Sequence, residues 1–261
     1  MKYVVCVKQV PDTTEVKIDP KTNTLIREGV PAILNPFDQF ALEECVRIRD
    51  ITGGEITVIS MGPEQARSAL MRCLALGGDK AILISDRAFA GSDTYATSYV
   101  LSLAIKKLGK FDLVFCGQQA IDGDTAQVGP ELAQNLGIPQ ITYVEAIEKI
   151  EDKKVVAKAQ TDDGYIIIEA KLPALVTCTP PTSFEPKSPM MSGIMKAKKK
   201  ELILWDTKII GSEADKYGLS GSPTQVIKVY PPPIKGKGLI LEGEPKECVE
   251  KIVSILKEHI I

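Results

Sequence analysis

The chain has 261 residues, of which 44% are hydrophobic and 25% charged, and its net charge at pH 7 is −2. These values are typical of a soluble globular protein and argue against nucleic acid or an anionic membrane as the main partner. No apolar run reaches the roughly 18 residues that a membrane span needs. The length suits one large α/β domain with an appendage, or two small domains.

The six cysteines lie far apart, without a Cys-x-x-Cys pair, and mostly in apolar runs. This pattern predicts reduced, buried cysteines in a cytoplasmic protein, and neither a metal site nor an iron–sulfur cluster. The only histidine, His259, lies near the end of the sequence, which argues against His-dependent hydrolase chemistry, so no catalytic residue is assigned. Residues 1–8 are too short and too soon interrupted for a signal peptide and predict a first strand.

Strand-like and helix-like runs alternate over the first half of the chain. Strands are expected at residues 2–8, 55–61, 80–84 and 111–116, and helices are expected to begin near residues 35, 62, 92 and 127. The long polar loop after the first strand is either functional or carries a small hairpin of its own, around residues 18–26.

Polar residues and a proline mark two of the helix starts. Asn35 is expected to cap the first helix, with Pro36 in its first position and Asp38 in its first turn. Ser92 or Asp93 is expected to cap the third helix. The helix boundaries are therefore predicted by capping chemistry as well as by hydrophobic spacing.

The alternation of strands and helices predicts a doubly wound parallel sheet with helices on both faces. Ligands of such sheets bind beyond the carboxyl ends of the strands, where the strand order reverses. In the common order the first and fourth strands are neighbours at that point, which places residues 6–13 beside residues 117–128. Neither a Gly-x-Gly-x-x-Gly after the first strand nor a P-loop motif occurs, so an ordinary dinucleotide or NTPase fingerprint is absent.

The stretch between the fourth strand and its helix, residues 116–130, carries the strongest functional signal. It is Cys-Gly-Gln-Gln-Ala-Ile-Asp-Gly-Asp-Thr-Ala-Gln-Val-Gly-Pro. Unpaired backbone N–H groups and the positive end of a helix dipole meet in such a loop, which favours a phosphate or pyrophosphate. Its three glycines would let the backbone approach a ligand. Asp122 and Asp124 do not suit an anion site and are expected to cap the turn, or to hold a ribose or amide. A turn that only connects a strand to a helix is the alternative.

After Pro139 the pattern changes to short strands. Residues 141–150 and 155–160 alternate or run apolar, Asp162 and Asp163 lie in a hairpin turn, and residues 165–172 return. With residues 174–179 beyond Pro173, they predict an antiparallel addition to the sheet.

The last part of the chain has little packed periodicity. Residues 180–193 predict a loop rich in proline and methionine, a lysine run follows, and residues 202–237 predict an arm. Residues 244–260 predict an amphipathic helix. The expected organisation is a nucleotide-binding α/β domain over residues 1–200, and a C-terminal arm and helix over residues 201–261 that pack on a partner subunit.

Three groups of residues have two possible roles. Thr94 and Thr97 would cap the third helix or contact a cofactor. The methionines at positions 190, 191 and 195 would fill a core or form a contact surface that adapts to its partner. The lysine run would be a solvated face or a docking surface for an acidic partner.

Five segments stand out in order along the chain: Cys6-Val7-Lys8-Gln9-Val10-Pro11-Asp12, Asn35-Pro36-Phe37, Gly117-Gln118-Gln119-Ala120-Ile121-Asp122, Leu172-Pro173-Ala174-Leu175-Val176-Thr177 and Ile194-Met195-Lys196-Ala197-Lys198-Lys199-Lys200. Together they resemble the β-subunit of electron-transfer flavoproteins, from about residue 2 to residue 205. The chain departs from the family at Ala159 and Gln160, where the family usually has charged residues.

The resemblance implies an α/β fold of the Rossmann-like, adenine-nucleotide α-hydrolase-like kind, with the antiparallel addition and the C-terminal arm. It also implies a heterodimer with an α-subunit that carries FAD. Housekeeping β-subunits hold AMP and resemble Asp-Asp-Asp-x-Asn-Gln-Thr-Gly in the glycine-rich loop. The loop in this chain instead resembles the electron-bifurcating branch, in which a second FAD replaces AMP, and Gly123 and Ala126 leave room for it.

The implied cofactor site lies on the loops after the first, second and fourth strands, with the two threonines of the third helix as further candidates. The candidate cofactor-binding residues are Cys6, Val7, Lys8, Asn35, Pro36, Phe37, Asp38, Met61, Thr94, Thr97, Gly117, Gln118, Gln119, Ala120, Ile121, Asp122, Gly123, Asp124, Thr125, Ala126, Gln127 and Val128.

In the bifurcating branch, NADH gives a hydride to the β-subunit FAD. One electron then goes to ferredoxin or flavodoxin, and the other goes through the α-subunit FAD to an acyl-CoA dehydrogenase-type partner. The protein positions the flavin and tunes its electronics. Met191 is the expected anchor for that partner. The candidate partner-binding residues are Met191, Ile194, Met195, Lys196, Lys198, Lys199 and Lys200.

Two alternatives stay open. The first is a non-bifurcating electron-transfer flavoprotein β-subunit that holds a structural AMP. The second, from another class, is a nucleotide-binding sensor of the universal-stress type, which would share only the α/β core and form a homodimer without flavin.

Overall fold

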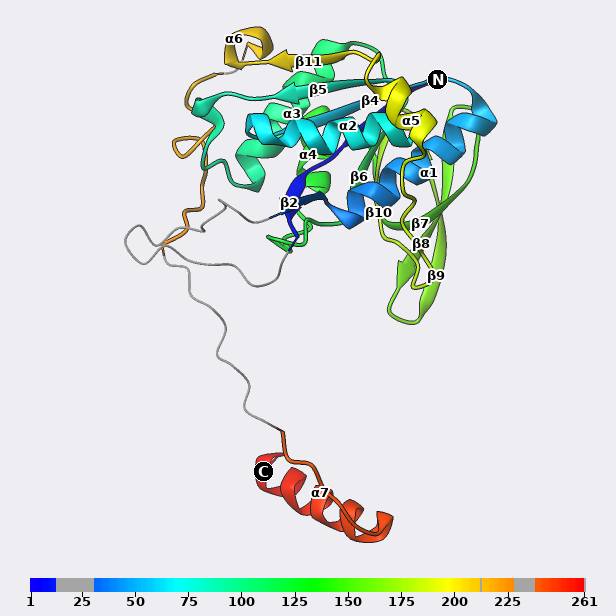
Figure 1. The fold of residues 1–261 in the computed structure, drawn as a ribbon, viewed down its shortest axis with the longest axis vertical. Helices are drawn as coiled ribbons and strands as arrows, with labels where there is room; N and C mark the ends of the chain where they lie inside the picture. Colours follow the sequence, from blue (N-terminus) through cyan, green and yellow to red (C-terminus); the bar gives the residue numbers. More distant parts are fainter. Residues whose placement is uncertain (13–30, 212, 228–237, 261) are drawn as a thin grey trace. The chain divides into compact units, whose positions relative to one another are not determined.

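Parallel strands with helices on both faces make up most of the first 227 residues (Figure 1). The structure is a computed structural model that describes residues 1–12, 31–211, 213–227 and 238–260. The chain divides into two compact units, Met1–Ile227 and Lys228–Ile261. The hairpin expected around residues 18–26 lies outside the described residues.

One nine-stranded sheet has the order β11-β5-β4-β1-β6-β10-β7-β8-β9. The pairs from β11 to β7 are parallel, and β8 and β9 are antiparallel. A separate antiparallel pair, β2 (Gln9–Pro11) and β3 (Ala32–Leu34), closes the base of the long loop after β1. The strands of the main sheet are β1 (Lys2–Cys6), β4 (Glu55–Met61), β5 (Lys80–Ile84), β6 (Leu113–Gly117), β7 (Gln140–Glu151), β8 (Lys154–Thr161), β9 (Gly164–Lys171), β10 (Ala174–Cys178) and β11 (Leu202–Trp205).

Two hydrophobic layers cover the sheet from β11 to β10, because these strands carry apolar residues on both faces, whereas β7, β8 and β9 contribute to one layer only. Helices α1 and α2 pack on one face, and α3 and α4 pack on the other. The first four helices each end at a glycine, and α1, α3 and α4 begin close to their expected residues. The second helix begins at Arg67 and not near residue 62, because a 3₁₀ turn at Glu64–Ala66 precedes it. The helices are α1 (Pro36–Thr52), α2 (Arg67–Leu76), α3 (Thr94–Leu108), α4 (Val128–Leu136), α5 (Met191–Ala197), α6 (Thr207–Ile210) and α7 (Pro245–Ile260), with short 3₁₀ turns η1 (Glu64–Ala66) and η2 (Arg87–Phe89).

The doubly wound α/β prediction is confirmed, including the pairing of the first and fourth strands, β1 and β6. The direction of β10 differs from the sequence expectation. It was expected in the antiparallel addition, and it instead lies parallel between β6 and β7. The cis peptide bond before Pro173 lies at the start of this strand.

The segment after the lysine run also differs from the expectation of an arm. Strand β11 pairs in parallel with β5 at the edge of the sheet, and α6 packs beside it. Residues 191–193, expected in a loop, form the first turn of α5. Strand β11 and helices α5 and α6 are all short, and therefore show little hydrophobic periodicity in the sequence.

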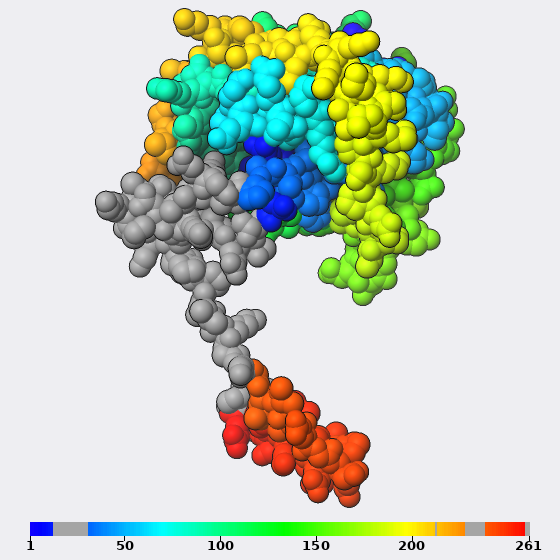
Figure 2. All heavy atoms as spheres, in the orientation of Figure 1, coloured from blue at the N-terminus to red at the C-terminus, as the bar shows by residue number. Residues whose placement is uncertain are grey.

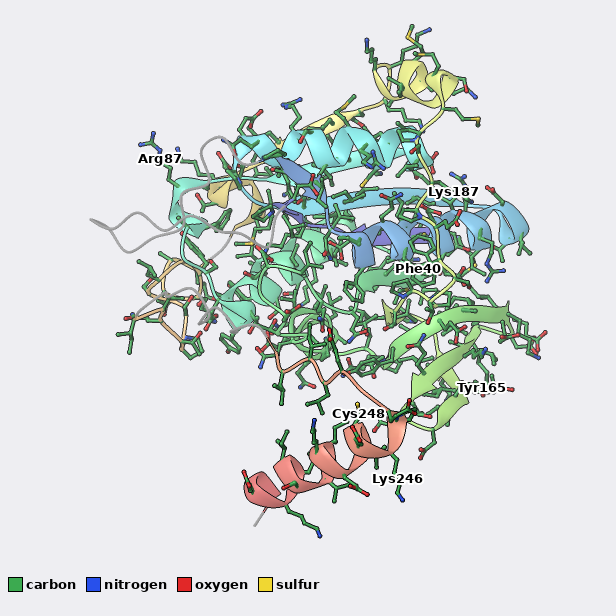
Figure 3. The ribbon with its side chains drawn as sticks, turned by 60° about the horizontal axis from the view of Figure 1, so that its bottom comes forward. Phe40, Arg87, Tyr165, Lys187, Lys246 and Cys248 are labelled. Atoms are coloured by element: carbon green, nitrogen blue, oxygen red, sulfur yellow. The ribbon has the colours of Figure 1, made fainter. Side chains whose placement is uncertain are left out.

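The second unit contains α7, in which Figure 3 labels Lys246 and Cys248. Its apolar residues recur at helical spacing and are exposed. They are Val249, Ile252, Val253 and Leu256. Within the described ranges, the helices are all too short or too polar to cross a bilayer.

Candidate functional site

The carboxyl ends of β1 and β6 lie side by side, because the two strands pair in parallel with Cys6 opposite Cys116. The loops that follow these strands therefore leave the sheet together. The N-terminal turns of α1 and α4 meet the same loops. We name residues 7–12 and 117–127, with the first turns of these two helices, the carboxyl-edge site.

Asn35 occupies the cap position of α1, but its side chain does not cap that helix. Its Nδ2 donates to the carbonyl oxygen of Gln119 at 2.8 Å, and its Oδ1 accepts from the N–H of Ile121 at 3.2 Å. Asn35 is fully buried. The capping expectation is therefore correct for the position and wrong for the hydrogen bond, because the loop after β6 supplies the partners.

Asp38 also bonds to backbone outside its own helix. Its Oδ2 accepts from the N–H of Lys8 at 2.7 Å, and its Oδ1 accepts from the N–H of Gly117 at 3.1 Å. Burial raises the pKa of this carboxyl from its ordinary value of 3.8 to about 7, although the hydrogen bonds from Lys8, Asn35 and Gly117 act in the opposite direction. Asp38 thus ties together the two loops of the carboxyl-edge site.

Lys8 and Asp122 join the same two loops on their exposed side. The Lys8 Nζ lies 2.7 and 2.8 Å from the two carboxylate oxygens of Asp122. Next to this ion pair, the Gln119 Nε2 donates to the Oδ1 of Asp124 at 2.8 Å. Asp122 therefore binds the lysine of the neighbouring loop, and Asp124 binds a side-chain amide of its own loop. Among the described residues, neither carboxylate makes the expected capping bond to the backbone of the turn.

The three glycines of the loop have different environments. A Cβ at Gly117 would collide with the Asp38 carboxylate, and a Cβ at Gly129 would collide with the side chain of Thr177. These two positions need glycine because parts of the protein pack against them. Gly123 has no positive φ and meets open space, whereas Asp124 and Ala126 have φ of 48° and 54°. The strained backbone of the loop is thus at residues 124 and 126.

The N-terminus of α4 lacks a side-chain cap. Gln127 precedes it, and the Gln127 Oε1 accepts from the Thr94 Oγ1 at 3.1 Å. Among the residues that the structure describes, the first-turn N–H groups of α4 therefore have no capping side chain, and the positive end of the helix dipole lies at the end of the loop. By contrast, α3 is capped by Asp93, whose carboxylate accepts from the N–H of Ala96 at 3.0 Å.

Glu131 is a polar residue of this region that the sequence analysis missed. Its Oε1 accepts from the Thr94 Oγ1 at 3.2 Å, and its Oε2 is buried without a hydrogen-bond partner among the described residues. Burial raises the pKa of the Glu131 carboxyl. Its position just after Gly129 and Pro130, in the first helical turn, was the available signal.

The other candidate residues lie around these contacts. Val7 is buried and donates its N–H to the carbonyl oxygen of Ile59, and Gln118 accepts at its Oε1 from the Thr179 Oγ1 at 2.6 Å. Met61 ends β4 and packs on the core beneath α3 and α4. Pro36 and Phe37 form the first turn of α1, and Thr97 lies one turn into α3. Ala120 and Thr125 lie within the loop.

The candidate partner-binding residues lie on α5, which packs on α2, and on the three lysines that follow it. Met191 is 73% exposed and Met195 is 53% exposed. Lys200 is the exception in the lysine run, because its ammonium group donates to the carbonyl oxygens of Gly78 at 2.6 Å and Leu74 at 3.2 Å. It holds the C-terminal end of α2, where backbone carbonyls attract a cation. Lys196, Lys198 and Lys199 are exposed.

The segment before α5 lies across α1 and α2, as the yellow spheres over blue and cyan ones show in Figure 2. The Gln39 Nε2 donates to the carbonyl oxygen of Lys187 at 2.8 Å, and the N–H of Lys187 donates to Glu43 at 2.9 Å. Phe40 and Phe184 pack edge to face with ring centroids 4.8 Å apart. Figure 3 labels Phe40 on α1 and Lys187 on the segment above it.

Comparisons with known proteins place this geometry in context. A family model described as the electron transfer flavoprotein domain matches residues 22–209. The chain is 52% identical to the "Caffeyl-CoA reductase-Etf complex subunit CarD" of Acetobacterium woodii, and 51% identical to the electron transfer flavoprotein subunit beta of Thermoanaerobacterium thermosaccharolyticum, in each case over the whole of both chains. It is 44% identical to the "Acryloyl-CoA reductase electron transfer subunit gamma" of Anaerotignum propionicum, again over both whole chains.

Proposed function

This chain belongs to the electron transfer flavoprotein family as a β-subunit, and from that premise we propose that it binds FAD at the carboxyl-edge site. The FAD, when bound, supplies hydride acceptance from NADH and the division of the electron pair between two routes. One route leads to ferredoxin or flavodoxin. The other leads through the FAD of the α-subunit to an acyl-CoA dehydrogenase-type enzyme.

The open N-terminus of α4 is the observation that carries this proposal. Its first turn lacks a side-chain cap and faces the glycine-containing loop after β6, so its N–H groups can bind the pyrophosphate of a dinucleotide. Lys8 supplies a positive charge from the neighbouring loop. Open space beside Gly123 and the small side chain of Ala126 suit a ligand larger than AMP.

The names of two relatives support the kind of partner enzyme. Their printed names attach them to a caffeyl-CoA reductase complex and an acryloyl-CoA reductase. Both names describe enzymes that act on unsaturated acyl-CoA, which agrees with an acyl-CoA dehydrogenase-type partner for this chain. We place the docking surface on α5, with Met191 as the apolar anchor and Ile194, Met195, Lys196, Lys198 and Lys199 around it.

The organisation and cellular setting follow from the same proposal. The second unit of this chain, which contains α7, acts as an arm that packs on the α-subunit. The five buried, unpaired cysteines of the described chain suit a reducing cytoplasm. A universal-stress-type sensor would share only the α/β core, whereas the relatives named as electron-transfer subunits match the whole chain.

Nucleotide analysis of the purified heterodimer tests the proposal. The expected result is two FAD and no AMP per heterodimer, with bleaching of flavin absorbance by NADH under anaerobic conditions. One FAD and one AMP, without reduction by NADH, would make this chain the AMP-holding β-subunit of a simple electron carrier.

The Gly123→Val variant tests whether the second nucleotide of the heterodimer binds in this chain. The space beside Gly123 is open and its φ is ordinary, so valine should be tolerated by the fold but should obstruct a bound dinucleotide. Gly238→Val is the matched control, because Gly238 also meets open space without a positive φ. Loss of one FAD in the first variant alone is expected, and unchanged flavin content would remove Gly123 from the site.

A further inference from the structure

The two polar side chains at the start of α1 serve other segments at the expense of their own helix. A cap-position asparagine normally accepts from an N–H in the first turn, and this bond stabilises a helix by about 1 kcal/mol. Asn35 makes no such bond. Both atoms of its amide are instead used by the loop after β6, at Gln119 and Ile121.

The carboxyl group of Asp38 likewise bonds to backbone outside its own helix. Its two oxygens accept from N–H groups that follow different strands, at Lys8 after β1 and at Gly117 at the end of β6. The Asp38 residue is 7% exposed. It has no ion pair among the described residues, and the nearby ammonium group of Lys8 is bound to Asp122. Burying a carboxyl in this way is unfavourable unless hydrogen bonds compensate.

These bonds act where the β-sheet ladder stops. The ladder already joins β1 to β6 from Tyr3–Leu113 to Cys6–Cys116. Beyond it, the N–H of Asn35 donates to the carbonyl oxygen of Lys8 at 3.0 Å, and the Asp38 carboxylate connects Lys8 with Gly117. An apolar side chain at this position would leave the N–H groups of Lys8 and Gly117 without this acceptor, so the Asp38 carboxyl is what joins the two loops beyond the ladder.

We propose that Asn35 and Asp38 are positioning residues that hold the loops after β1 and β6 at a fixed separation, so that the nucleotide site is formed before the nucleotide arrives. This inference rests on the proposed function, because it gives a role to the same site. Neither side chain needs to touch the nucleotide. Their contribution is to the fraction of molecules in which the site is ready to bind.

The close approach at Gly117 supports this role. A Cβ at Gly117 would collide with the Asp38 carboxylate and with the backbone at Phe37 and Asp38. The end of β6 therefore packs directly on the first turn of α1, with no room to slide. A small displacement of this contact would move Gln119 and Ile121, which Asn35 holds, and would carry the loop away from α4.

The test uses the full chain in complex with its α-subunit, after removal of bound nucleotide. Asp38→Asn keeps the shape of the side chain but points an NH₂ group at one of the two N–H donors. Asn35→Ala removes both bonds to the loop. Asp86→Asn is the matched control, because Asp86 also ties two segments, accepting from the N–H of Ala88 at 3.0 Å and the Thr207 Oγ1 at 2.7 Å.

Amide hydrogen exchange is the readout that a general loss of stability would not reproduce. In Asp38→Asn, exchange should accelerate about tenfold or more at Lys8 and Gly117, and in Asn35→Ala at Ile121, with strand amides such as Val5 unchanged. The association rate of added FAD or AMP should fall by a similar factor, while dissociation changes less. Asp86→Asn should change exchange at Ala88 and Thr207 only.

Unchanged exchange and unchanged association in both variants, with wild type binding FAD or AMP normally, would overturn the inference. Wild-type protein that binds neither FAD nor AMP would instead refute the proposed function, and the exchange data would still show whether the two side chains hold the loops. If Asp38→Asn does not fold, Asn35→Ala alone decides, because its bonds are to one surface loop.

Discussion

Lys8 is the only positively charged residue among the candidates for cofactor contact, and Asp122 already holds its ammonium group. The pair is partly exposed, so it contributes little to stability. The pair matters for binding because a bound pyrophosphate and Asp122 would compete for the same ammonium group. A bound pyrophosphate would need the Lys8 charge that Asp122 occupies, and the second carboxylate of the loop, Asp124, adds to the repulsion.

Opposite effects are therefore expected from the two members of this pair. Lys8→Gln should weaken FAD binding to the heterodimer by about tenfold, because a charge-assisted hydrogen bond is lost. Asp122→Asn should strengthen it by a few-fold, because the lysine is released. Fluorescence titration of the nucleotide-depleted heterodimer measures both. Equal weakening in the two variants would show that the pair acts by shaping the loop.

Asp38 should make stability depend on pH in an unusual direction. Its folded pKa of about 7 lies above its ordinary value of 3.8, because burial disfavours the charged form. The folded state then binds the proton more tightly than the unfolded state. Stability from this group is complete below about pH 4 and decreases by about 1.4 kcal/mol per pH unit as the pH rises towards 7, above which it is constant.

The comparison of wild type with Asp38→Asn isolates this effect, because asparagine does not titrate. The difference in melting temperature between the two heterodimers should shift in favour of the variant from pH 5 to pH 7, and should then level off. A difference that is independent of pH over this range would mean that Asp38 is ionised throughout.

At the scale of elements, the regular strands and helices of the first half were predictable and the exceptions have physical causes. The expected second and third strands match β4 and β5 because apolar runs and glycine ends mark both. Strand β10 was placed in the antiparallel addition because a hairpin precedes it, whereas its pairing depends on distant β6. Non-local pairing leaves no mark on local sequence.

The site was predictable to the level of the loops but not of the bonds. Strand order and glycine content indicated which loops meet. The sequence could not show that Asn35 bonds to residues 84 and 86 positions away, nor that Gly117 and Gly129 are needed for internal packing. Those facts depend on which atoms compete for each donor in the folded chain.

The segment before α5 yields a prediction at the same scale. Phe184 packs on Phe40 of α1, and the exposed Met191 follows in the same segment at the start of α5. Phe184→Ala should loosen the segment and slow electron delivery to the acyl-CoA dehydrogenase-type partner several-fold, as Met191→Ala should. Nucleotide content should be unchanged. Ile51→Ala is the control, because Ile51 lies at a highly exposed position on α1.

Stopped-flow transfer from the reduced heterodimer to the partner enzyme measures these effects. If Phe184→Ala loses nucleotide in step with electron transfer, the segment supports the whole of α1 and not docking in particular. Normal transfer in Met191→Ala would remove α5 from the docking surface.

At the scale of the whole molecule, the two compact units differ in how their apolar residues are used. The first unit buries its core in two layers against the sheet. In the second unit, α7 exposes an apolar face within the described chain. A helix with such a face is stabilised mainly by packing on another surface. The sequence predicted this helix and its face, since both follow from local periodicity.

Charging the apolar face of α7 should therefore weaken the heterodimer. Val253→Asp with Leu256→Asp places two charges where burial of each side chain would contribute about 1.5–3 kcal/mol. The expected result is at least a tenfold loss of affinity for the α-subunit by analytical ultracentrifugation. Lys251→Asp, on the opposite face of the helix, should have little effect.

Because residues 1–227 contain the carboxyl-edge site, FAD binding by the double variant should persist. Full affinity for the α-subunit in that variant would show that α7 serves another surface, and loss of FAD together with loss of the dimer would show that the α-subunit completes the nucleotide site.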